Sequence, residues 1–532
     1  MTRMLLSRDD ILALYNPPGK ETLNLLTGSV AVPDKPSSTD ELPPLQSESP
    51  EAQEASKHEA GTGKGRSPGR SRASAGRSTG DQRPSTNRDM LTGLSNRAHF
   101  QSRCEEAVAE ARSAGRKIAL LLMGLDRFRD LNNALGHQVG DAVLIEIAQS
   151  LPSIVSANDL LGRFGGDEFA LMLTDPSSES DVGSVASRML DIAATSLRRR
   201  APMLRSGASL GMAHFPEHGS NADELIQNAD IALQGAKADG RGRAQVFTPQ
   251  MRAMLMERLQ QISAFEAAVE IGQVVPFYQP QMRLSDRRSY GFEALARWVL
   301  PNGDILYPAH FRAALDDPDA AILLGEHMLH KVSDDLRRWR GADMPGCKVS
   351  VNATGPELRR GDYAAKVARI FTTKNVPLSE LTVEITESVL LDDKASRVGE
   401  TLSDLRKLGV SIALDDFGTG FASLTHLKSY AVNQIKIDRS FISDLPSNTD
   451  DWAIVRATLG LARNLGIQTV AEGLEDWRHL KCLQTLGCDF GQGFFFSPAI
   501  PANEAEAYFR QHRAYKKADL YQFELDALPR TG

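Results

Sequence analysis

The sequence predicts an α/β protein with two folded units that follow a long unfolded segment. In the second half, eight short apolar runs alternate with helical stretches. They extend over about 260 residues, which is the pattern of a (β/α)8 barrel. Residues 89–247 carry a separate alternation of strand and helix patterns. Residues 46–88 contain no Val, Ile, Leu, Met, Phe, Trp or Tyr, and such a stretch cannot bury enough apolar surface to offset the entropy lost on folding.

The composition excludes several classes of protein. Hydrophobic residues make up 41% of the 532 residues and charged residues 24%, which excludes a wholly disordered, collagen-like or disulfide-framed chain. The net charge of −7 gives no sign of a molecule-wide surface for nucleic acid. The four cysteines are scattered without metal-site spacing, which is typical of a reducing compartment. No apolar run approaches the ~20 residues of a membrane span, so we expect a cytoplasmic protein.

We expect residues 1–88 to be mostly disordered. Their charges are segregated, because acids dominate residues 33–56 whereas Lys and Arg dominate residues 57–88. Two interpretations stay open. The segment is either a Ser/Gly/Pro/Arg linker or a basic arm that touches anionic lipid or nucleic acid.

The first folded unit, residues 89–247, begins with a helical pattern that runs through Arg112. Residues 118–125 are apolar throughout, which predicts a short buried strand. The cluster of Asn, Gly and Asp in residues 127–141 predicts a loop, and residues 142–151 predict a helix.

A β-hairpin is predicted next, because two apolar runs flank Gly165-Gly166. Asp167 and Glu168 begin its second strand. Acids at a hairpin tip suit the binding of a nucleotide and a metal ion, since the neighbouring glycines let the backbone approach phosphate. A solvated turn has the same composition, so these four residues alone do not distinguish a nucleotide site from an ordinary turn.

The surrounding segments extend this hairpin into a family pattern. In chain order they are DMLTGLSNR, LDRFRDLNNALGHQVGD, RFGGDEF, SLGMAHFP and NADIALQGAKADGRGR. Together they closely resemble the GGDEF domain of bacterial diguanylate cyclases. The resemblance implies a palm-like α/β fold, related to nucleotidyl cyclases, that condenses two GTP molecules into cyclic di-GMP. It implies guanine contacts from Asn132 and Asp141, a triphosphate clamp from Lys237 and Arg241, and metal binding with activation of the 3′-hydroxyl by Asp167 and Glu168.

Two departures from the family pattern argue against cyclase activity. Gly124 stands where the family has an aspartate that binds metal, and glycine supplies no side-chain oxygen. Phosphoryl transfer then lacks a charge stabiliser worth several kcal/mol. Asp126 lies about 6–7 Å further along the strand and is not expected to substitute. Ser156 replaces the Arg of the family's Arg-x-x-Asp inhibition motif. We therefore expect a degenerate domain that binds GTP as a regulatory ligand or has a structural role.

Residues 248–268 have apolar side chains at helical spacing and predict a connecting helix. Two roles stay open for it. It either packs locally or transmits nucleotide state and dimer geometry between the units.

The second unit, residues 269–520, contains the eight strand-like runs and precedes a tail at residues 521–532. The runs are VVPFYQP, SYGFEALARW, CKVSVNA, LTVEIT, SIALDDFG, QIKID, QTVAEG and CDFGQGF. Nearly every run carries or ends in a polar or charged residue, among them Glu293, Asn352, Glu384, Asp415, Asp416, Lys436, Asp438 and Glu472. A helix cap explains any one acid equally well. The carboxyl ends of barrel strands meet at one face, however, so their coincidence predicts a single site.

Oxygen donors without His or Cys clusters favour Mg²⁺ or Mn²⁺ over zinc. The adjacent Asp415 and Asp416 can serve two ions ~3.5–4 Å apart, an arrangement that activates water and stabilises the leaving oxygen of a phosphoryl displacement. Lys436, at a neighbouring strand end, can orient that water or offset negative charge. The pattern predicts metal-assisted phosphodiester hydrolysis.

Residues 293–298, EALARW, add a second resemblance. With FYQPQ, SVNATGPEL, LTVEITES, ALDDFGTGFASL, IKIDRSFI, AEGLE and CDFGQGF, they resemble the EAL domain of cyclic di-GMP phosphodiesterases over about half the chain. The resemblance implies hydrolysis of cyclic di-GMP to linear pGpG with two Mg²⁺ or Mn²⁺ ions. The implied metal ligands are Glu293, Asn352, Glu384, Asp415 and Asp416, and the implied substrate contacts are Gln279, Arg297 and Gln492. Three further residues have implied catalytic roles: Lys436 positions water, Glu472 is a general base or further ligand, and Glu387 steadies the loop at residues 416–420.

The leading hypothesis is a cyclic di-GMP phosphodiesterase whose first unit is a GTP-binding regulatory or structural module. Two alternatives remain, a bifunctional cyclase and phosphodiesterase and a non-catalytic cyclic di-GMP receptor or scaffold. The family's habit of dimerising implies a homodimer.

Overall fold

The computed structural model describes most of the chain after its first 86 residues. The described residues are 87–203, 207–342, 344, 346–391, 397–418, 430 and 432–513. Of the segment expected to be mostly disordered, residues 1–88, the first 86 residues lie outside the described ranges, as does the tail at residues 521–532. The chain divides into two compact units at Leu255 and Met256. Within the described ranges, every helix is too short or too polar to cross a bilayer.

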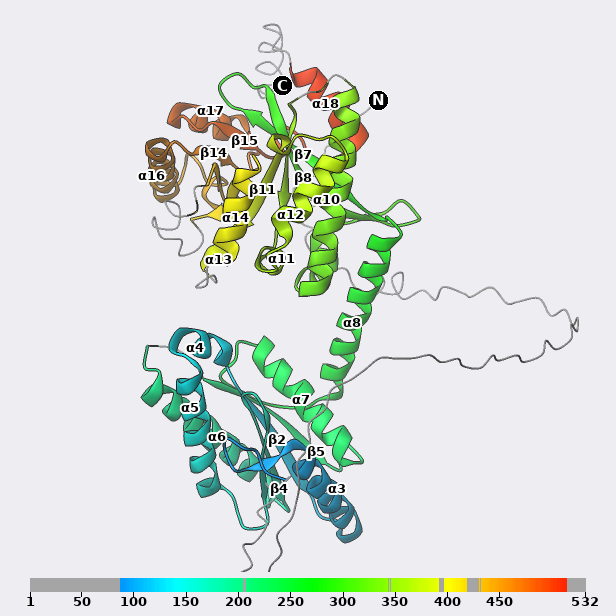
Figure 1. The fold of residues 1–532 in the computed structure, drawn as a ribbon, viewed down its shortest axis with the longest axis vertical. Coiled ribbons are helices and arrows are strands. Elements are labelled where there is room, and N and C mark those ends of the chain that lie inside the picture. The colour runs from blue at the N-terminus through cyan, green and yellow to red at the C-terminus, as the bar shows by residue number, and fades with distance from the viewer. Residues whose placement is uncertain are drawn as a thin grey trace, which may run out of the picture. The chain divides into compact units, whose positions relative to one another are not determined.

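The first unit is a six-stranded sheet with helices on both faces (Figure 1), and the predicted α/β fold is confirmed. The strand order is β1-β3-β4-β2-β5-β6. The strands are β1 (Ser95–Asn96), β2 (Ile118–Leu125), β3 (Leu160–Gly165), β4 (Glu168–Thr174), β5 (Ala208–Phe215) and β6 (Ala244–Val246). The helices are α3 (Arg97–Ala114), α4 (Phe128–Leu135), α5 (His137–Ser150), α6 (Glu179–Arg200) and α7 (Ala222–Ala238).

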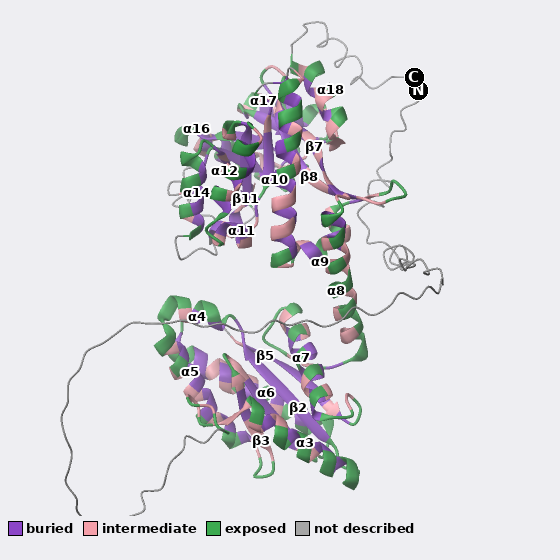
Figure 2. Cartoon of the chain, turned by 45° about the vertical axis from the view of Figure 1, so that its right-hand side comes forward, coloured by how far each residue is buried: buried purple, intermediate pink, exposed green. Residues whose placement is uncertain are grey.

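Strand β2 is buried along its whole length, as Figure 2 shows, because helices cover both of its faces. Leu121 and Met123 pack into the apolar cluster that includes α5 and α6. Leu120 and Leu122 point to the opposite face and join the cluster formed with α3 and α7. The period-2 alternation of a strand therefore serves two cores, which explains the uninterrupted apolar run in the sequence.

The loop predicted for residues 127–141 is wrong, because α4 and the start of α5 occupy most of it. Phe128 and Leu131 are buried and give α4 an apolar face that its polar composition conceals. Gly136 separates the two helices with φ +85°, a conformation that glycine adopts without steric cost.

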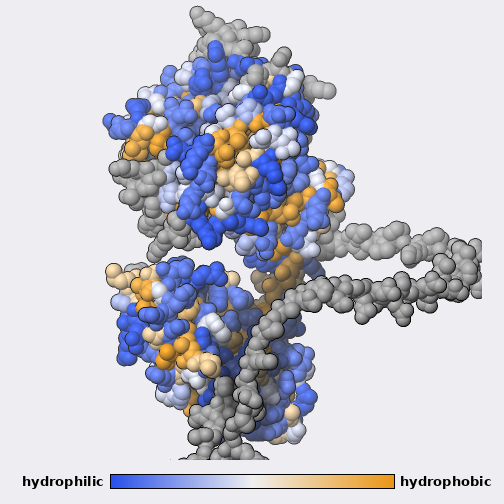
Figure 3. Space-filling model, in the orientation of Figure 1, coloured by the Kyte–Doolittle hydropathy of each residue, from blue (hydrophilic) through white to orange (hydrophobic). Residues whose placement is uncertain are grey.

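Helix α8 (Pro249–Glu270) follows the first unit, and the division between the units falls inside it. Its second half is anchored by Phe265, which is fully buried in the core of the second unit. In its first half, Met254, Met256 and Leu259 are exposed, and Figure 3 shows hydrophobic surface along this helix. Local packing therefore accounts for only part of its apolar residues.

The second unit is a closed eight-stranded barrel surrounded by helices (Figure 1). The barrel strands are β7 (Val274–Arg283), β8 (Ser289–Val299), β10 (Lys348–Asn352), β11 (Leu381–Thr386), β12 (Ser411–Phe417), β13 (Gln434–Ile437), β14 (Gln468–Ala471) and β15 (Phe490–Gln492). Two short strands extend it, β9 (Ile305–Leu306) and β16 (Ile500–Pro501). The helices are α9 (Arg312–Leu315), α10 (Pro318–Gly341), α11 (Gly355–Arg359), α12 (Tyr363–Thr373), α13 (Glu387–Leu391), α14 (Arg397–Lys407), α16 (Thr449–Leu465), α17 (Trp477–Leu486) and α18 (Ala502–Arg513).

All eight predicted strands are present, but the first runs against the others. Strand β7 pairs antiparallel with β8 and with β15, whereas the pairs from β8 through β15 are parallel. Residues 284–288 alone join β7 to β8. A connection this short permits only antiparallel pairing, because a parallel pair needs a crossover of a dozen or more residues.

Candidate active site

The strand register brings the predicted barrel residues to one end of the barrel. Asn352 at the end of β10 lies level with Glu384 on β11, and Thr386 at the end of β11 lies level with Asp415 on β12. Glu293 is supplied from within β8. Because parallel strands end at the same face, side chains far apart in the sequence converge there.

Lys436 of β13 lies at the centre of this group and is only 1% exposed. Its Nζ donates to Glu384 Oε2 at 2.6 Å and lies 2.7 Å from Glu472 Oε1. Asp415 Oδ1 is 3.2 Å away and Glu293 Oε2 is 3.4 Å away. One ammonium thus faces four carboxylates, so the cluster is rich in negative charge.

The carboxylates form two groups whose ligating atoms lie within 4.8 Å of one another. One group is Glu293, Glu384 and Asp415, and the other is Asp415, Asp416 and Glu472. Asp415 belongs to both. A carboxylate shared by two oxygen-donor groups, one of which includes the adjacent Asp416, suits the pair of divalent ions that the sequence predicts.

A divalent ion fits the residues of this site. Glu384 Oε1 is buried and has no hydrogen-bond partner within the described part of the chain. A buried carboxylate oxygen without a partner is costly, and a cation would satisfy it. The donors are oxygen atoms, which suit Mg²⁺ or Mn²⁺.

A chain of amides holds Glu293 in place. Asn352 Nδ2 donates to its Oε1 at 3.0 Å, and Gln492 Nε2 donates to its Oε2 at 2.6 Å. The same Gln492 nitrogen lies 2.9 Å from Gln279 Oε1, and Gln281 Nε2 donates to Gln492 Oε1 at 3.1 Å. The sequence pattern did not single out Gln281. The sequence could have indicated Gln281 because it lies two residues after Gln279 on a predicted strand, and this spacing puts both side chains on one face.

The pKa values of the group reflect the balance of burial and charge. Burial alone would lower the pKa of Lys436, but the surrounding carboxylates, with Glu293 and Glu384 foremost, hold it well above its usual value. Burial raises the pKa of Glu472 to about 8 against the opposing charge of Lys436. For Glu293, Lys436 and the amide donors outweigh burial and lower the pKa.

The remaining predicted residues lie around this centre. Asp416 has φ +55°, and its N–H donates to Asp415 Oδ1 at 3.0 Å. A non-glycine residue in this region is uncommon and is found preferentially at functional sites. Glu387 is buried at the start of α13, which packs against β12. Part of the loop assigned to it, residues 419–420, lies outside the described residues. The Arg297 guanidinium lies 4.8 Å from the centre of the Tyr307 ring.

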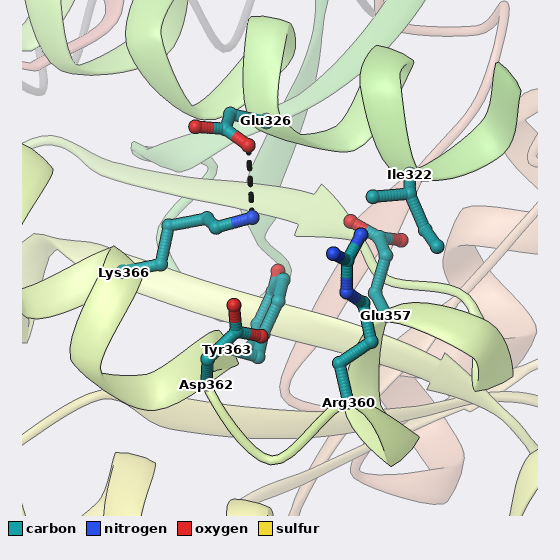
Figure 4. A pocket seen from close by; sticks show the side chains of 7 residues that line it. All are labelled: Ile322, Glu326, Glu357, Arg360, Asp362, Tyr363 and Lys366. Atoms are coloured by element: carbon teal, nitrogen blue, oxygen red, sulfur yellow. Dashed lines mark hydrogen bonds and ion pairs between the residues drawn. The ribbon is translucent and has the colours of Figure 1, made fainter. Parts of the chain in front are cut away.

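Glu357 on α11 is a buried acid that the sequence pattern did not bring out. Its Oε2 accepts hydrogen bonds from Thr354 N and Thr354 Oγ1, both at 2.7 Å. With Arg360 it lines a cavity of about 10 Å³ near the Lys366–Glu326 ion pair, and Figure 4 shows these side chains. The Thr-x-x-Glu spacing of residues 354–357 is that of a helix capping box, and this pattern is the sequence signal from which Glu357 could have been found. These bonds fix the first turn after Asn352, the end of β10.

In the first unit, the hairpin acids lie beside Gly124. Gly124 pairs directly with Glu168 of β4, and Asp167 lies at the hairpin tip. Burial raises the pKa of Glu168, and Asp230 adds to the increase while Lys237 opposes it. Lys237 projects from α7 over Gly124, with its Nζ 3.0 Å from the position that a Cβ at residue 124 would occupy.

The other predicted nucleotide residues lie on the helices and turns around this hairpin. Asn132 is on α4, packed against Gly140, and its Oδ1 is buried without a hydrogen-bond partner among the described residues. Asp141 is exposed on α5, and Arg241 follows α7 with φ +63°. An orphaned amide oxygen at Asn132 is compatible with a ligand that supplies a donor.

Comparison with known proteins decides the family. The model of the diguanylate cyclase GGDEF domain matches residues 86–243, and the model of the EAL domain matches residues 262–499. The chain is a tandem GGDEF–EAL protein. The predicted succession of a cyclase-like unit and an EAL barrel is confirmed.

Curated relatives share both domains of this GGDEF–EAL protein. One is the bifunctional diguanylate cyclase/cyclic di-GMP phosphodiesterase MucR of Pseudomonas aeruginosa, 34% identical over 417 residues, 78% of this chain and 60% of MucR. Another is the cyclic di-GMP phosphodiesterase NbdA of the same species, 31% identical over 80% of this chain and 54% of NbdA. The chain thus spans little more than half of these relatives. A solved structure of the MucR phosphodiesterase in complex with c-di-GMP is 32% identical over 46% of this chain and 99% of the other, with a TM-score of 0.44.

Proposed function

We propose that this GGDEF–EAL protein hydrolyses cyclic di-GMP to linear pGpG at the mouth of its barrel. The observation that carries the proposal is the pair of carboxylate groups that share Asp415 around a buried ammonium. The names of the relatives, which are cyclic di-GMP phosphodiesterases, support the same substrate.

The metal ligands proposed for the site are Glu293, Asn352, Glu384, Asp415 and Asp416, which would hold two Mg²⁺ or Mn²⁺ ions. When bound, such ions generate a nucleophile from water and stabilise the leaving oxygen of a phosphodiester. Lys436 orients the attacking water and offsets negative charge, and the ionised form of Glu472, 2.7 Å from its Nζ, accepts the proton. Gln279, Arg297 and Gln492 contact the dinucleotide, and Glu387 steadies the turn after β12.

The test is turnover of cyclic di-GMP by the purified chain in Mg²⁺ and in Mn²⁺, with products separated by chromatography. We expect pGpG, and we expect Asp415→Asn to lower kcat by about a thousandfold, since a lost metal ligand removes several kcal/mol of transition-state stabilisation. The matched control is Asp404→Asn, whose carboxylate pairs with Lys407 on the surface of α14, and it is expected to retain full activity. Intact cyclic di-GMP in both metals would refute the proposal.

We propose further that the GGDEF unit binds GTP as a regulator and that the chain acts as a homodimer. The orphaned Asn132 Oδ1 and the cation at Lys237 support a nucleotide in this unit. GTP is then expected to change kcat or KM for cyclic di-GMP. Identical kinetics with and without GTP would contradict the regulatory role and leave hydrolysis unaffected.

A bifunctional enzyme is the second candidate, because MucR is named as one. It requires cyclase activity despite Gly124. Lys436→Ala protein incubated with GTP distinguishes the two, since hydrolysis is silenced and any cyclic di-GMP made will accumulate. A non-catalytic receptor is the third candidate, and tight binding of cyclic di-GMP without hydrolysis would favour it.

A further inference from the structure

A lysine occupies the space beside the hairpin acids of the GGDEF unit. Gly124 pairs with Glu168 on one side and with Ser209 on the other, so it lies in the middle of the sheet. Directly paired residues of antiparallel strands point their side chains to the same face. The side chain of Lys237 covers the glycine on its Cβ side, with Nζ 3.0 Å and Cε 3.3 Å from a Cβ built there. The missing side chain at residue 124 is therefore replaced by an ammonium.

The nearby acid Asp126 is buried and hydrogen-bonded. It is 5% exposed, its Oδ1 accepts from Ser209 Oγ at 2.8 Å, and its Oδ2 accepts from Gly242 N at 3.1 Å. These bonds hold the turn that carries Arg241. Asp126 therefore helps to position Arg241, the residue before Gly242.

The residues at this hairpin do not fit a divalent ion. Gly124 offers no carboxylate, and the fixed ammonium of Lys237 repels a second cation. Asp167 and Glu168 are the carboxylates that remain at the hairpin, and among the described residues neither belongs to a group of three metal-ligand side chains. Lysine and arginine are, by contrast, ordinary partners of phosphate.

We propose that the GGDEF unit binds the triphosphate of GTP without a divalent ion, because the Lys237 ammonium over Gly124 supplies the positive charge. This inference rests on the proposal that the unit binds GTP. It adds that binding at this unit is independent of metal, whereas hydrolysis at the barrel requires it.

The experiment measures equilibrium binding of radiolabelled GTP to the full chain in EDTA and in Mg²⁺. We expect dissociation constants within about threefold of each other for the unaltered chain. Lys237→Ala is expected to weaken binding about tenfold or more in EDTA, since a charge-assisted contact is lost, whereas Lys237→Arg retains it. Gly124→Asp places a carboxylate against the ammonium, so its binding in EDTA is expected to weaken about tenfold and to recover in Mg²⁺.

The matched control is Lys117→Ala, which removes a surface lysine of the same unit that pairs with Glu217 at 2.8 Å, and its affinity is expected to equal that of the unaltered chain. Melting curves identify any variant that does not fold, and the comparison of EDTA with Mg²⁺ in the unaltered chain needs no variant. Binding in Mg²⁺ alone would overturn the inference and preserve the regulatory proposal. Absence of GTP binding in both conditions would overturn both, with hydrolysis of cyclic di-GMP still tested separately.

Discussion

The Lys436 ammonium donates to the Glu384 carboxylate across 2.6 Å, and the two side chains are 1% and 0% exposed. Neither charge reaches water, so each depends on the other for its solvation. Glu472 and Asp415 lie within 3.2 Å of the same nitrogen. A single cation on β13 therefore holds together carboxylates from β11, from β12 and from the end of β14.

Lys436→Met is expected to destabilise the metal-free barrel by about 3–5 kcal/mol, because removing one partner of a buried ion pair leaves an uncompensated charge. Divalent cations neutralise the same carboxylates, so Mg²⁺ should raise the melting temperature of the variant more than that of the unaltered chain. Thermal unfolding in EDTA and in Mg²⁺ measures both effects. Lys366→Met, which breaks the partly exposed pair with Glu326, is the control. An equal response of the two variants to Mg²⁺ would contradict the account.

Gln492→Leu is expected to weaken the metal affinity of the barrel by roughly 10- to 100-fold, the usual cost of losing a hydrogen bond to a metal ligand. The Gln492 amide donates to Glu293 at 2.6 Å and so orients the carboxylate. At saturating cyclic di-GMP, activity should recover at high Mn²⁺, because the metal ligand Glu293 itself remains. Titration of activity with Mn²⁺ measures the shift. Gln468→Leu, at the exposed start of β14, should titrate normally, and a Gln492 variant with unchanged metal affinity would refute the positioning role.

Tyr307→Leu is expected to raise KM for cyclic di-GMP about threefold while leaving kcat nearly constant. The Arg297 guanidinium lies 4.8 Å from the Tyr307 ring centre, and a cation–π contact of this kind is worth ~0.5–1 kcal/mol. Its loss frees the arginine proposed to contact the substrate. Steady-state kinetics at saturating metal separate the two constants. Tyr307→Phe, which keeps an aromatic face, should behave as the unaltered chain, and a fall in kcat alone would argue for another role.

Much of the fold followed from the sequence because apolar runs mark strands and polar residues mark their ends. The barrel strands and the convergence of Glu293, Glu384 and Asp415 were predicted in this way. The direction of β7 was not, since a hydrophobic run carries no polarity and the short connection at residues 284–288 decides it. Helix α4 was missed because its core contacts are few and its composition is that of a loop.

The sequence also did not predict contacts between side chains that are distant along the chain. The sequence showed that Gly124 supplies no ligand, but only the packing of α7 on the sheet places Lys237 over it. Likewise, the sequence assigned Lys436 to orienting water or offsetting negative charge, but it did not show that the ammonium faces four carboxylates at once. Such relations depend on register and rotamer, which no local pattern encodes.

Glu357 should make the stability of the barrel depend on pH. Burial raises its pKa from 4.5 to about 7, although Thr354 donates to it. Because the pKa is higher in the folded state than in the unfolded chain, the protonated carboxyl group stabilises the fold. This contribution is complete below pH 4.5 and is lost as pH rises through 7. The free energy of unfolding changes by at most about 3 kcal/mol. Glu357→Gln stays neutral and still accepts the Thr354 bonds. The stability of the variant relative to the unaltered chain should therefore be higher at pH 8 than at pH 5. Urea unfolding at the two pH values measures the difference, with Glu400→Gln on the exposed face of α14 as the control. Parallel pH profiles of the Glu357 variant and the unaltered chain would show that this carboxyl group ionises as it does in water.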